Sequence, residues 1–181
     1  MTKTTRHLVV GLMMTGLVGV GRLAAADEGG PATRRVRSSN PAIVALIQRA
    51  SDESATFRRL VDAIDASDGI VYVEEGACGH GVRACLAGVM TAGPTRFLRV
   101  KVDTRKADWD LMGSIGHELR HTIEVLGQPS VRSSVDMYFF YERQGRHGTG
   151  GTFETQAATD AGAAVRDEVR HALKRDAANR H

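Results

Sequence analysis

Five consecutive residues, His117-Glu118-Leu119-Arg120-His121, carry the clearest chemical signal in this chain. The segment matches the pattern H-E-x-x-H, in which two histidines four positions apart lie on one face of a helix. Two imidazoles placed in this way reach one zinc ion, and the glutamate between them lies beside it as a general base. The residue types and their spacing therefore predict His117 and His121 as metal ligands and Glu118 as the catalytic residue.

A third ligand is needed, because catalytic zinc sites use three protein ligands and keep one position for water. Glu124 lies three residues after His121 but a turn further along the helix, so it is better placed to orient an imidazole. Glu154 is the stronger candidate for the third ligand. We expect it to begin the buried stripe of the final helix, with Ala158 and Val165, where an inward-facing acid requires a cation. The alternative is an acid favoured by the helix dipole.

The helix that carries the motif has its own apolar stripe, which lies nearly opposite the two histidines. Its members recur at spacings of three and four: Met112, Ile115, Leu119, Ile123 and Leu126. Such a stripe is typical of the side of a helix that faces the core. Gly113 and Ser114 lie on the histidine face, and small residues there leave room for another element to approach. This pattern favours a binding site over two core histidines.

The segment 117–121, followed 33 positions after its last histidine by Glu154-Thr155-Gln156-Ala157, resembles the gluzincin metallopeptidases. In that family the third zinc ligand is a glutamate on a later helix, often within E-x-x-A. The resemblance covers roughly the second half of the chain and implies a minimal zincin-like fold. It also implies that His117, His121 and Glu154 bind Zn²⁺, with Glu118 as the general base.

The chain departs from the family at one supporting position. Many gluzincins place an aspartate four residues after the ligand glutamate, where this chain has Ala158. Glu124 or Asp160 would have to take over that supporting role.

The reaction that the resemblance implies is hydrolysis of a peptide bond, in a peptide or protein substrate, by zinc-bound water. Glu118 would take the proton from the water and pass it to the leaving amine. The candidate donors to the oxyanion lie between the motif and Glu154: Tyr138, Tyr141, Arg143 and His147. The strand expected at Arg96–Val102 would offer its edge to an extended substrate.

Two other classes of function stay open. One is an exported protein that binds zinc for structure or for a partner and hydrolyses nothing. The other is a metal-free helical interaction domain in which the motif arises by chance.

The first 26 residues have the features of a secretory signal peptide. Lys3 and Arg6 make a basic start, an apolar run extends from Leu8 to Val20, and Ala24-Ala25-Ala26 supply small residues for cleavage. The run is short for a membrane span, so we expect an exported protein, periplasmic or secreted, with no stable membrane insertion after cleavage. An uncleaved N-terminal anchor is the alternative.

The net positive charge of the chain comes from the predicted signal peptide. The chain has 24 basic and 21 acidic residues, and Lys3, Arg6 and Arg22 lie in the leader with no acid beside them. The remaining chain is balanced in charge and has few aromatic residues, which argues against nucleic-acid binding.

Two cysteines, Cys78 and Cys85, lie close together in a glycine-rich stretch. In an exported protein such a pair predicts a disulfide bond that closes a short loop. The alternative is a second metal site formed by Cys78, His80 and Cys85, whose spacing fits no zinc pattern well.

The elements that must position these residues follow from periodicity and turn residues. After a flexible lead-in at residues 27–40, a single domain is predicted over residues 41–181. Its predicted elements are a helix from Pro41, capped by Asn40, to Asp68-Gly69; strands at Ile70–Val73 and Arg96–Val102; helices at Asp108–Leu126, Ser130–Tyr141 and Thr152–Asp176; and a loop at Gly145–Gly151. A helix, a small sheet and three further helices indicate the α+β class.

Overall fold

The computed structural model describes residues 34–79, 81–106, 108–144 and 153–179.

The first helix begins where its cap residues predict. Helix α1 spans Pro41–Glu53, and the Asn40 side chain accepts a hydrogen bond of 2.9 Å from the Ala42 N–H. Proline at the first helical position has no N–H group to leave unsatisfied, which suits it to this start.

A break at Ser54 divides the stretch that the sequence predicts as one helix. Ser54 has an extended backbone (φ −128°, ψ 116°) and caps helix α2, Ala55–Asp65, by accepting a hydrogen bond from the Phe57 N–H. Its hydroxyl donates to Glu168 Oε2 at 2.6 Å, so a carboxylate of the last helix holds the break. The prediction of one continuous helix is wrong because the serine satisfies an N–H group of a new helix start.

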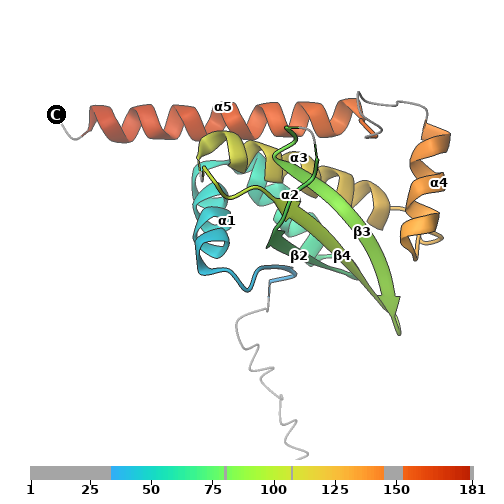
Figure 1. Cartoon of the computed structure of the whole chain (residues 1–181). Helices are drawn as coiled ribbons and strands as arrows, with labels where there is room; N and C mark the ends of the chain where they lie inside the picture. Colours follow the sequence, from blue (N-terminus) through green and yellow to red (C-terminus); the bar gives the residue numbers. More distant parts are fainter. Residues whose placement is uncertain (1–33, 80, 107, 145–152, 180–181) are drawn as a thin grey trace, which may run out of the picture. The chain divides into compact units, whose positions relative to one another are not determined.

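Four strands form one mixed sheet in the order β1-β2-β4-β3 (Figure 1). The strands are β1 Val36–Arg37, β2 Gly69–Glu75, β3 Ala84–Ala92 and β4 Thr95–Val102. β1 and β4 each run parallel to β2, whereas β3 runs antiparallel to β4. The prediction that Arg96–Val102 offers a free edge is wrong. This segment lies in β4, which pairs with β2 on one side and with β3 on the other. Among the described residues, β3 forms one edge of the sheet and β1 forms the other.

The end of the expected flexible lead-in, residues 27–40, belongs to the folded unit. Val36 is buried in β1, and the Val71 N–H donates to Arg35 O at 2.8 Å. Pairing with β2 and burial of the valine offset the entropy lost in ordering this short segment. All the described residues belong to one compact unit, which therefore starts before residue 41. Residues 27–33 lie outside the described part.

Strands β3 and β4 form a hairpin that closes at Gly93 and Pro94. Ala92 pairs with Thr95, and Gly93 has a positive φ of 58°, which a residue without a Cβ adopts at little cost. A two-residue turn containing glycine between two apolar runs is a hairpin signal, and it would have identified β3 in the sequence.

Cys78 and Cys85 form the predicted disulfide bond. The bond ties the segment after β2 to the start of β3. Because the bond uses both thiols, the alternative metal site with His80 loses its sulfur ligands, and His80 itself lies outside the described residues.

Three further helices complete an α+β fold. They are α3 Trp109–Leu126, α4 Ser134–Gln144 and α5 Gln156–Ala178. α3 lies between the sheet and α5, contacting β3 and β4 as well as α5, and α4 packs beside β3 (Figure 1). No helix in the described ranges combines the length and apolar character that crossing a bilayer requires.

The last two helices begin later than the sequence predicts. Ser133 Oγ accepts a hydrogen bond from the Asp136 N–H, and Thr155 Oγ1 accepts one from the Ala158 N–H. These hydroxyls cap new helix starts, so α4 starts at Ser134 and α5 at Gln156. The predicted loop at 145–151 lies outside the described residues.

The core lies between the sheet and the helices. Alternate residues of β4 point into it, and its largest fully buried side chains include Phe57, Ile64, Leu98, Leu111, Ile115 and Leu119. The predicted stripe of α3 is confirmed, since Met112, Ile115 and Leu119 are buried and face this core.

Arg96 of β4 holds the C-terminal end of α3. Its buried guanidinium donates to the carbonyl oxygens of Val125 and Leu126 at 3.0 and 2.7 Å, and to Asp68 at 2.6 Å. The last carbonyl groups of a helix have no partner within the helix, and this guanidinium supplies one.

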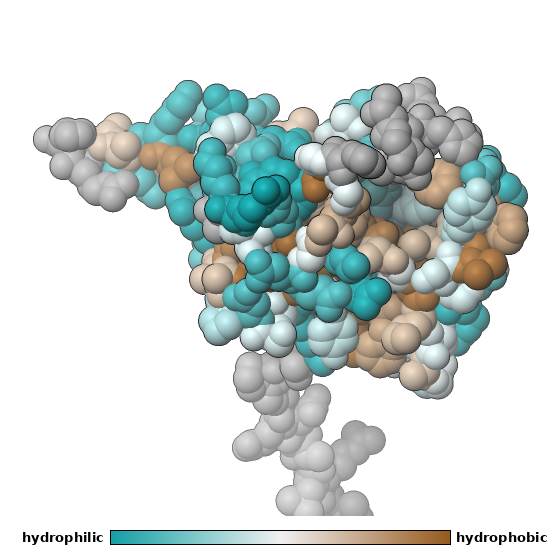
Figure 2. All heavy atoms as spheres, viewed as in Figure 1, coloured by the Kyte–Doolittle hydropathy of each residue, from teal (hydrophilic) through white to brown (hydrophobic). Residues whose placement is uncertain are grey.

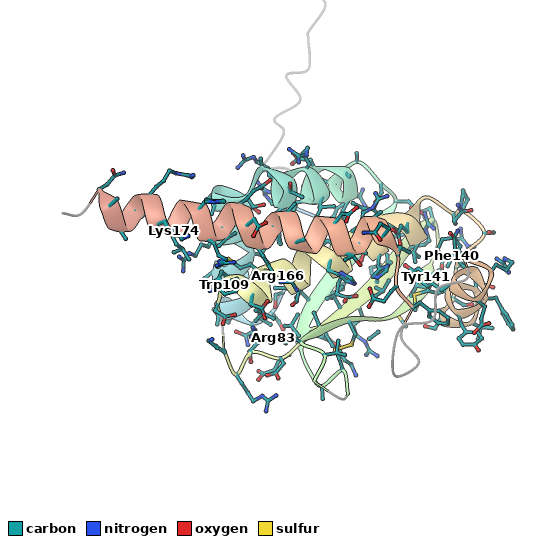
Figure 3. All side chains as sticks on the ribbon, turned by 90° about the horizontal axis from the view of Figure 1, so that it is seen from above. Arg83, Trp109, Phe140, Tyr141, Arg166 and Lys174 are labelled. Atoms are coloured by element: carbon teal, nitrogen blue, oxygen red, sulfur yellow. A yellow bond between two sulfur atoms is a disulfide. The ribbon has the colours of Figure 1, made fainter. Side chains whose placement is uncertain are left out.

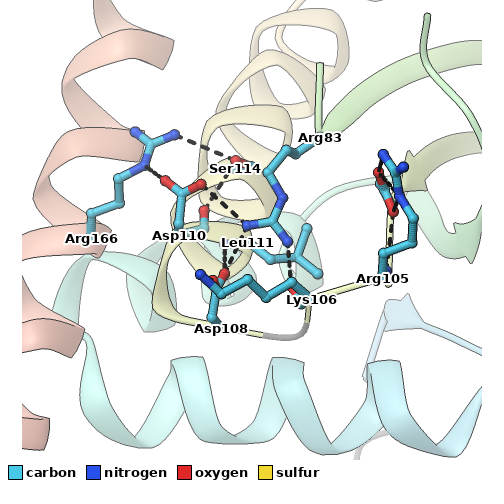
Figure 4. Close-up of polar contacts among 9 residues, drawn as sticks. Arg83, Arg105, Lys106, Asp108, Asp110, Leu111, Ser114 and Arg166 are labelled. Atoms are coloured by element: carbon cyan, nitrogen blue, oxygen red, sulfur yellow. Dashed lines mark hydrogen bonds and ion pairs between the residues drawn. The ribbon is translucent and has the colours of Figure 1, made fainter. Parts of the chain in front are cut away.

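Acid–arginine pairs hold the N-terminal end of α3 (Figure 4). Asp108 caps the helix by accepting a hydrogen bond of 3.0 Å from the Leu111 N–H. Arg83, next to β3, contacts Asp108 at 2.7 Å and Asp110 at 3.2 Å, and Arg166 of α5 contacts Asp110 at 2.8 Å. The start of α3 is thus tied both to the edge strand and to α5.

Candidate metal centre

The two motif histidines lie on the face of α3 that α5 approaches. Their ring centroids are 4.8 Å apart, with the rings nearly perpendicular. A Cβ on Gly116 would lie 2.8 Å from Val165 Cγ2, and a Cβ on Gly162 would lie 3.0 Å from His117 Cβ. The helices therefore pack closely only because these positions are glycines, as the small residues beside the motif predict.

His117, His121 and Glu154 form a group that could hold a metal ion. One ligand atom from each residue lies within 4.8 Å of the others. His117 Nε2 is 3.2 Å from Glu154 Oε2, and His121 Nε2 is buried with no hydrogen-bond partner among the described residues. A buried nitrogen without a partner is costly, so the donor set fits a cation at this point.

Glu124 and Tyr141 fix the other side of the His121 ring. His121 Nδ1 lies 3.0 Å from Glu124 Oε2 and 3.2 Å from the Tyr141 hydroxyl, which donates to His121 O at 3.1 Å. A carboxylate at Nδ1 favours the tautomer that carries its proton there. Nε2 is then the nitrogen with a free lone pair, directed at the metal group. The prediction that Glu124 orients an imidazole is confirmed.

Glu124 also links His121 to the segment that carries Glu154. Thr155 Oγ1 donates to Glu124 Oε1 at 2.8 Å, and Thr155 directly follows Glu154. Burial opposes the charge of Glu124, but hydrogen bonds from His121 and Thr155 outweigh it and lower the pKa of this carboxyl. A charged carboxylate thus connects the two segments that carry the candidate ligands, α3 and the segment before α5.

Glu118 lies between the metal group and the edge strand. Its Oε2 accepts a hydrogen bond of 2.7 Å from the Leu86 N–H of β3, and its Oε1 lies 4.0 Å from His117 Nε2. Burial raises the pKa of Glu118 to about 7. A carboxyl with a pKa near neutrality both takes and releases protons readily, which suits a general base.

Burial, followed by the charges at His121 and Arg166, lowers the pKa of His117 to about 4. A histidine binds a metal through its neutral imidazole, so this environment favours the form that binds.

Glu154 reaches the group from a different place than the sequence predicts. It precedes α5 instead of beginning its buried stripe, because Thr155 caps that helix. Its side chain is 42 % exposed, whereas that of His117 is 17 % exposed. The expectation of an inward-facing helical acid is wrong, but the structure does bring this carboxylate to His117.

Asp160, Tyr138 and Arg143, which the sequence also suggests as supporting residues or oxyanion donors, are not members of the group. Asp160 is exposed and accepts a hydrogen bond from Gln156, so it does not support the site. Tyr138 and Arg143 are exposed, and His147 lies outside the described residues.

Two pockets flank the group, one on each side of Glu118 and Glu154. The first has a volume of about 340 Å³, and we call it the catalytic pocket after the catalytic role that the sequence predicts for Glu118 in its wall. Its largely apolar wall includes Leu86, Met137, Tyr138, Tyr141 and Phe153. The second has a volume of about 350 Å³ and is polar, with Arg83, Asp110 and Arg166 in its wall. Figure 3 shows Tyr141 near α4, and Arg83 and Arg166 farther toward the start of α3.

The apolar wall is the part of the site that sequence reasoning missed. Leu86 belongs to the strand that went unrecognised, and Met137 and Phe153 have no chemistry that marks them. The wall forms because α4 and the segment before α5 meet β3 here.

Comparisons with protein-family models, with curated proteins and with solved structures found no match. The fold is an α+β fold and the site is a His/His/Glu group that could bind a metal. The function is therefore argued from this geometry.

Proposed function

We propose that this chain is an exported zinc-dependent metallopeptidase of the gluzincin type. The observation that carries the proposal is the meeting of His117, His121 and Glu154 beside the carboxylate of Glu118. Two imidazoles and one carboxylate are a donor set of catalytic zinc sites, which leave one position open. A zinc ion held there would lower the pKa of a water molecule and polarise a carbonyl group.

Glu118 moves the proton in this proposal. Its Oε2 is held by the Leu86 N–H, which leaves Oε1 on the side of His117 to take a proton from water. The same oxygen then gives the proton to the nitrogen of the leaving amine. A pKa of about 7, raised by burial, makes both transfers feasible near neutral pH.

The edge strand β3 supports binding of an extended substrate. Arg83 O accepts a hydrogen bond from Asp103 N on the β4 side, whereas the Leu86 N–H points away to Glu118. Because backbone groups alternate along a strand, Ala84 turns its N–H and C=O to the same side as Leu86. Ala84 is buried but lines both pockets that flank Glu118, so a peptide that enters either pocket brings a peptide bond beside Glu118.

The test of the catalytic role is Glu118→Gln. The variant should keep its zinc, because Glu118 is no ligand, and should lose hydrolysis of casein or of a peptide library. Unchanged hydrolysis would remove Glu118 from the mechanism. Glu118→Asp is a second variant for the same test. It keeps the carboxyl group but moves it farther from the metal group, so the variant should have reduced activity.

The test of the metal group is Glu154→Ala. Loss of one of three protein ligands should lower zinc retention after dialysis, measured as zinc per chain by atomic absorption. Asp160→Ala, six residues later and exposed, is the matched control and should retain zinc. Wild-type zinc content in Glu154→Ala would refute its role as a ligand.

A second candidate function is zinc binding without hydrolysis, for structure or for a partner. The observation that favours it concerns oxyanion donors. The Tyr141 hydroxyl is directed at His121, and Tyr138 and Arg143 are exposed, so none of these three is positioned as a free donor. Stoichiometric zinc, no hydrolysis of any library peptide and unfolding on chelation would select this function.

Export rests on the N-terminal sequence and has a separate test. N-terminal sequencing of the protein from a secreting host should begin at Asp27, after Ala24-Ala25-Ala26. A chain that still begins at Met1 would exclude cleavage.

A further inference from the structure

The catalytic pocket does not end at α4 but adjoins a second apolar cavity. This cavity, the outer pocket, has a volume of about 280 Å³ and includes Tyr72, Met90 and Phe97 in its wall. Ala87 and Ser134 line both pockets, so the two share a boundary. The catalytic pocket lies on the side of α3, and the outer pocket includes residues that point away from the core, such as Tyr72 and Arg99.

The outer pocket exposes large apolar side chains to solvent. Met90 is 67 % exposed and Tyr72 is 41 % exposed, although both lie within strands. Figure 2 shows hydrophobic side chains gathered over the side of the body where β3 and α4 lie. An ion pair between Arg99 and Glu74 at 3.2 Å, on neighbouring strands, gives the pocket a polar rim. An apolar floor with a polar rim is typical of a binding surface.

The boundary between the pockets directs an extended chain from one to the other. Ser134 Oγ lies 3.2 Å from both the N and the O of Val89, so it occupies the edge of β3 at that point. The register of β3 shifts between Leu86 and Gly88. A chain that leaves the catalytic pocket along β3 therefore meets Ser134 and passes over Ala87 into the outer pocket.

We infer that the substrate is an extended, apolar stretch of polypeptide that occupies the catalytic pocket and the outer pocket together. The inference rests on the proposed function for the cleavage step and names its substrate class. A stretch lying along β3 from Ala84 to Met90 needs about seven residues, since each extended residue spans about 3.3 Å. Cleavage then falls inside a chain, next to a large uncharged side chain, with a second apolar residue several positions away.

The experiment measures binding apart from cleavage. A fluorescein-labelled apolar peptide of about ten residues, long enough to span both pockets, is titrated into the zinc-loaded Glu118→Gln variant, and anisotropy is recorded. The same titration uses a truncated peptide that reaches only the catalytic pocket. Met90→Lys places a charge in the outer pocket. It should weaken binding of the long peptide about tenfold, because an apolar contact is lost. The short peptide should bind equally to both proteins.

Val44→Lys is the control, because Val44 is exposed on α1 away from both pockets. It should leave the affinity of both peptides unchanged. Equal affinity of the long peptide for Met90→Lys and for the parent would overturn the inference, as would failure of the long peptide to bind. Met90→Lys could selectively weaken binding of the long peptide while the wild-type chain cleaves neither peptide. That result would support the binding of an extended chain across both pockets and refute the peptidase proposal.

Discussion

His121 is the residue in which the chemistry of the site is most constrained. Its ring is buried, Glu124 and Tyr141 lie at Nδ1, and Nε2 has no partner among the described residues. A buried polar atom without a partner costs about 1–3 kcal/mol. The ring therefore gains most from a metal ion at Nε2, and its orientation depends on Glu124.

Replacement of Glu124 by alanine should weaken zinc binding by about 10–100-fold, because the imidazole loses the carboxylate that orients it. Thr155→Ala should give a smaller loss in the same direction, since Thr155 only supports Glu124. Competition with a fluorescent zinc chelator measures both affinities. Asp160→Ala is again the matched control, because Asp160 lies outside the site. Wild-type affinity in Glu124→Ala would show that the ring is oriented by Tyr141 alone.

At the scale of elements, the motif depends on how both ends of α3 are held. Arg96 satisfies carbonyl groups at the end of the helix, and Asp108 satisfies an N–H group at its start. The helix lies between the sheet and α5, so neither end can shift without moving the histidines.

Arg96→Met should destabilise the fold by about 3 kcal/mol, because buried carbonyl groups at the end of α3 lose their donor. Urea unfolding followed by circular dichroism measures the loss. Arg99→Met is the control on the same strand: Arg99 is 56 % exposed and pairs with an exposed acid. That pair should contribute less than about 1 kcal/mol. Similar losses in the two variants would argue against the capping role of Arg96.

Gly116→Leu should destabilise the fold by about 2 kcal/mol, because the close contact between α3 and α5 leaves no room for a larger side chain. A Cβ there would already lie 2.8 Å from Val165. The shift of α5 should also lower zinc retention. Ala163→Leu, on the exposed side of α5, should change neither property. Thermal unfolding and zinc content after dialysis report on both, and unaltered values in Gly116→Leu would contradict this packing.

At the scale of the whole molecule, the pairing of Arg83 with Asp108 at the start of α3 makes stability depend on pH. Burial opposes the charge of Asp108, but hydrogen bonds from Arg83, the Leu111 N–H and Lys106 prevail and lower its pKa from 3.8 to about 2. A carboxyl with a lowered pKa in the fold stabilises it above its unfolded pKa. The contribution disappears as the pH falls from 3.8 through about 2.

Asp108→Asn should therefore cost about 2 kcal/mol at pH 7 and progressively less as the medium is acidified below about pH 4. Asparagine caps a helix as well as aspartate, so the substitution removes the charge and keeps the cap. Urea unfolding of the zinc-free proteins at several pH values measures the difference. A difference that does not change with pH would mean that the charge of Asp108 contributes nothing.

Much of the candidate site could be predicted from the sequence because local spacing determines it. The i, i+4 spacing places two imidazoles on one helical face, and the small residues Gly113 and Ser114 beside them predict close approach of another element. The contact of Glu124 with His121 also follows from spacing, since Glu124 lies three positions after His121 on the same helix. Caps were harder to predict: Ser54 and Thr155 end or begin helices inside stretches whose apolar periodicity continues past them.

The sequence by itself determined that two histidines share one face of a helix with Glu118 between them, and it determined the disulfide and the α+β class, because each depends on spacing or residue type along a short segment. Only the tertiary structure decided that β3 is the edge strand beside Glu118, and that Glu154 reaches His117 from an extended segment before α5. It also decided that α4 closes an apolar pocket against β3. These features depend on which distant segments pack together, and short-range periodicity carries no information about that.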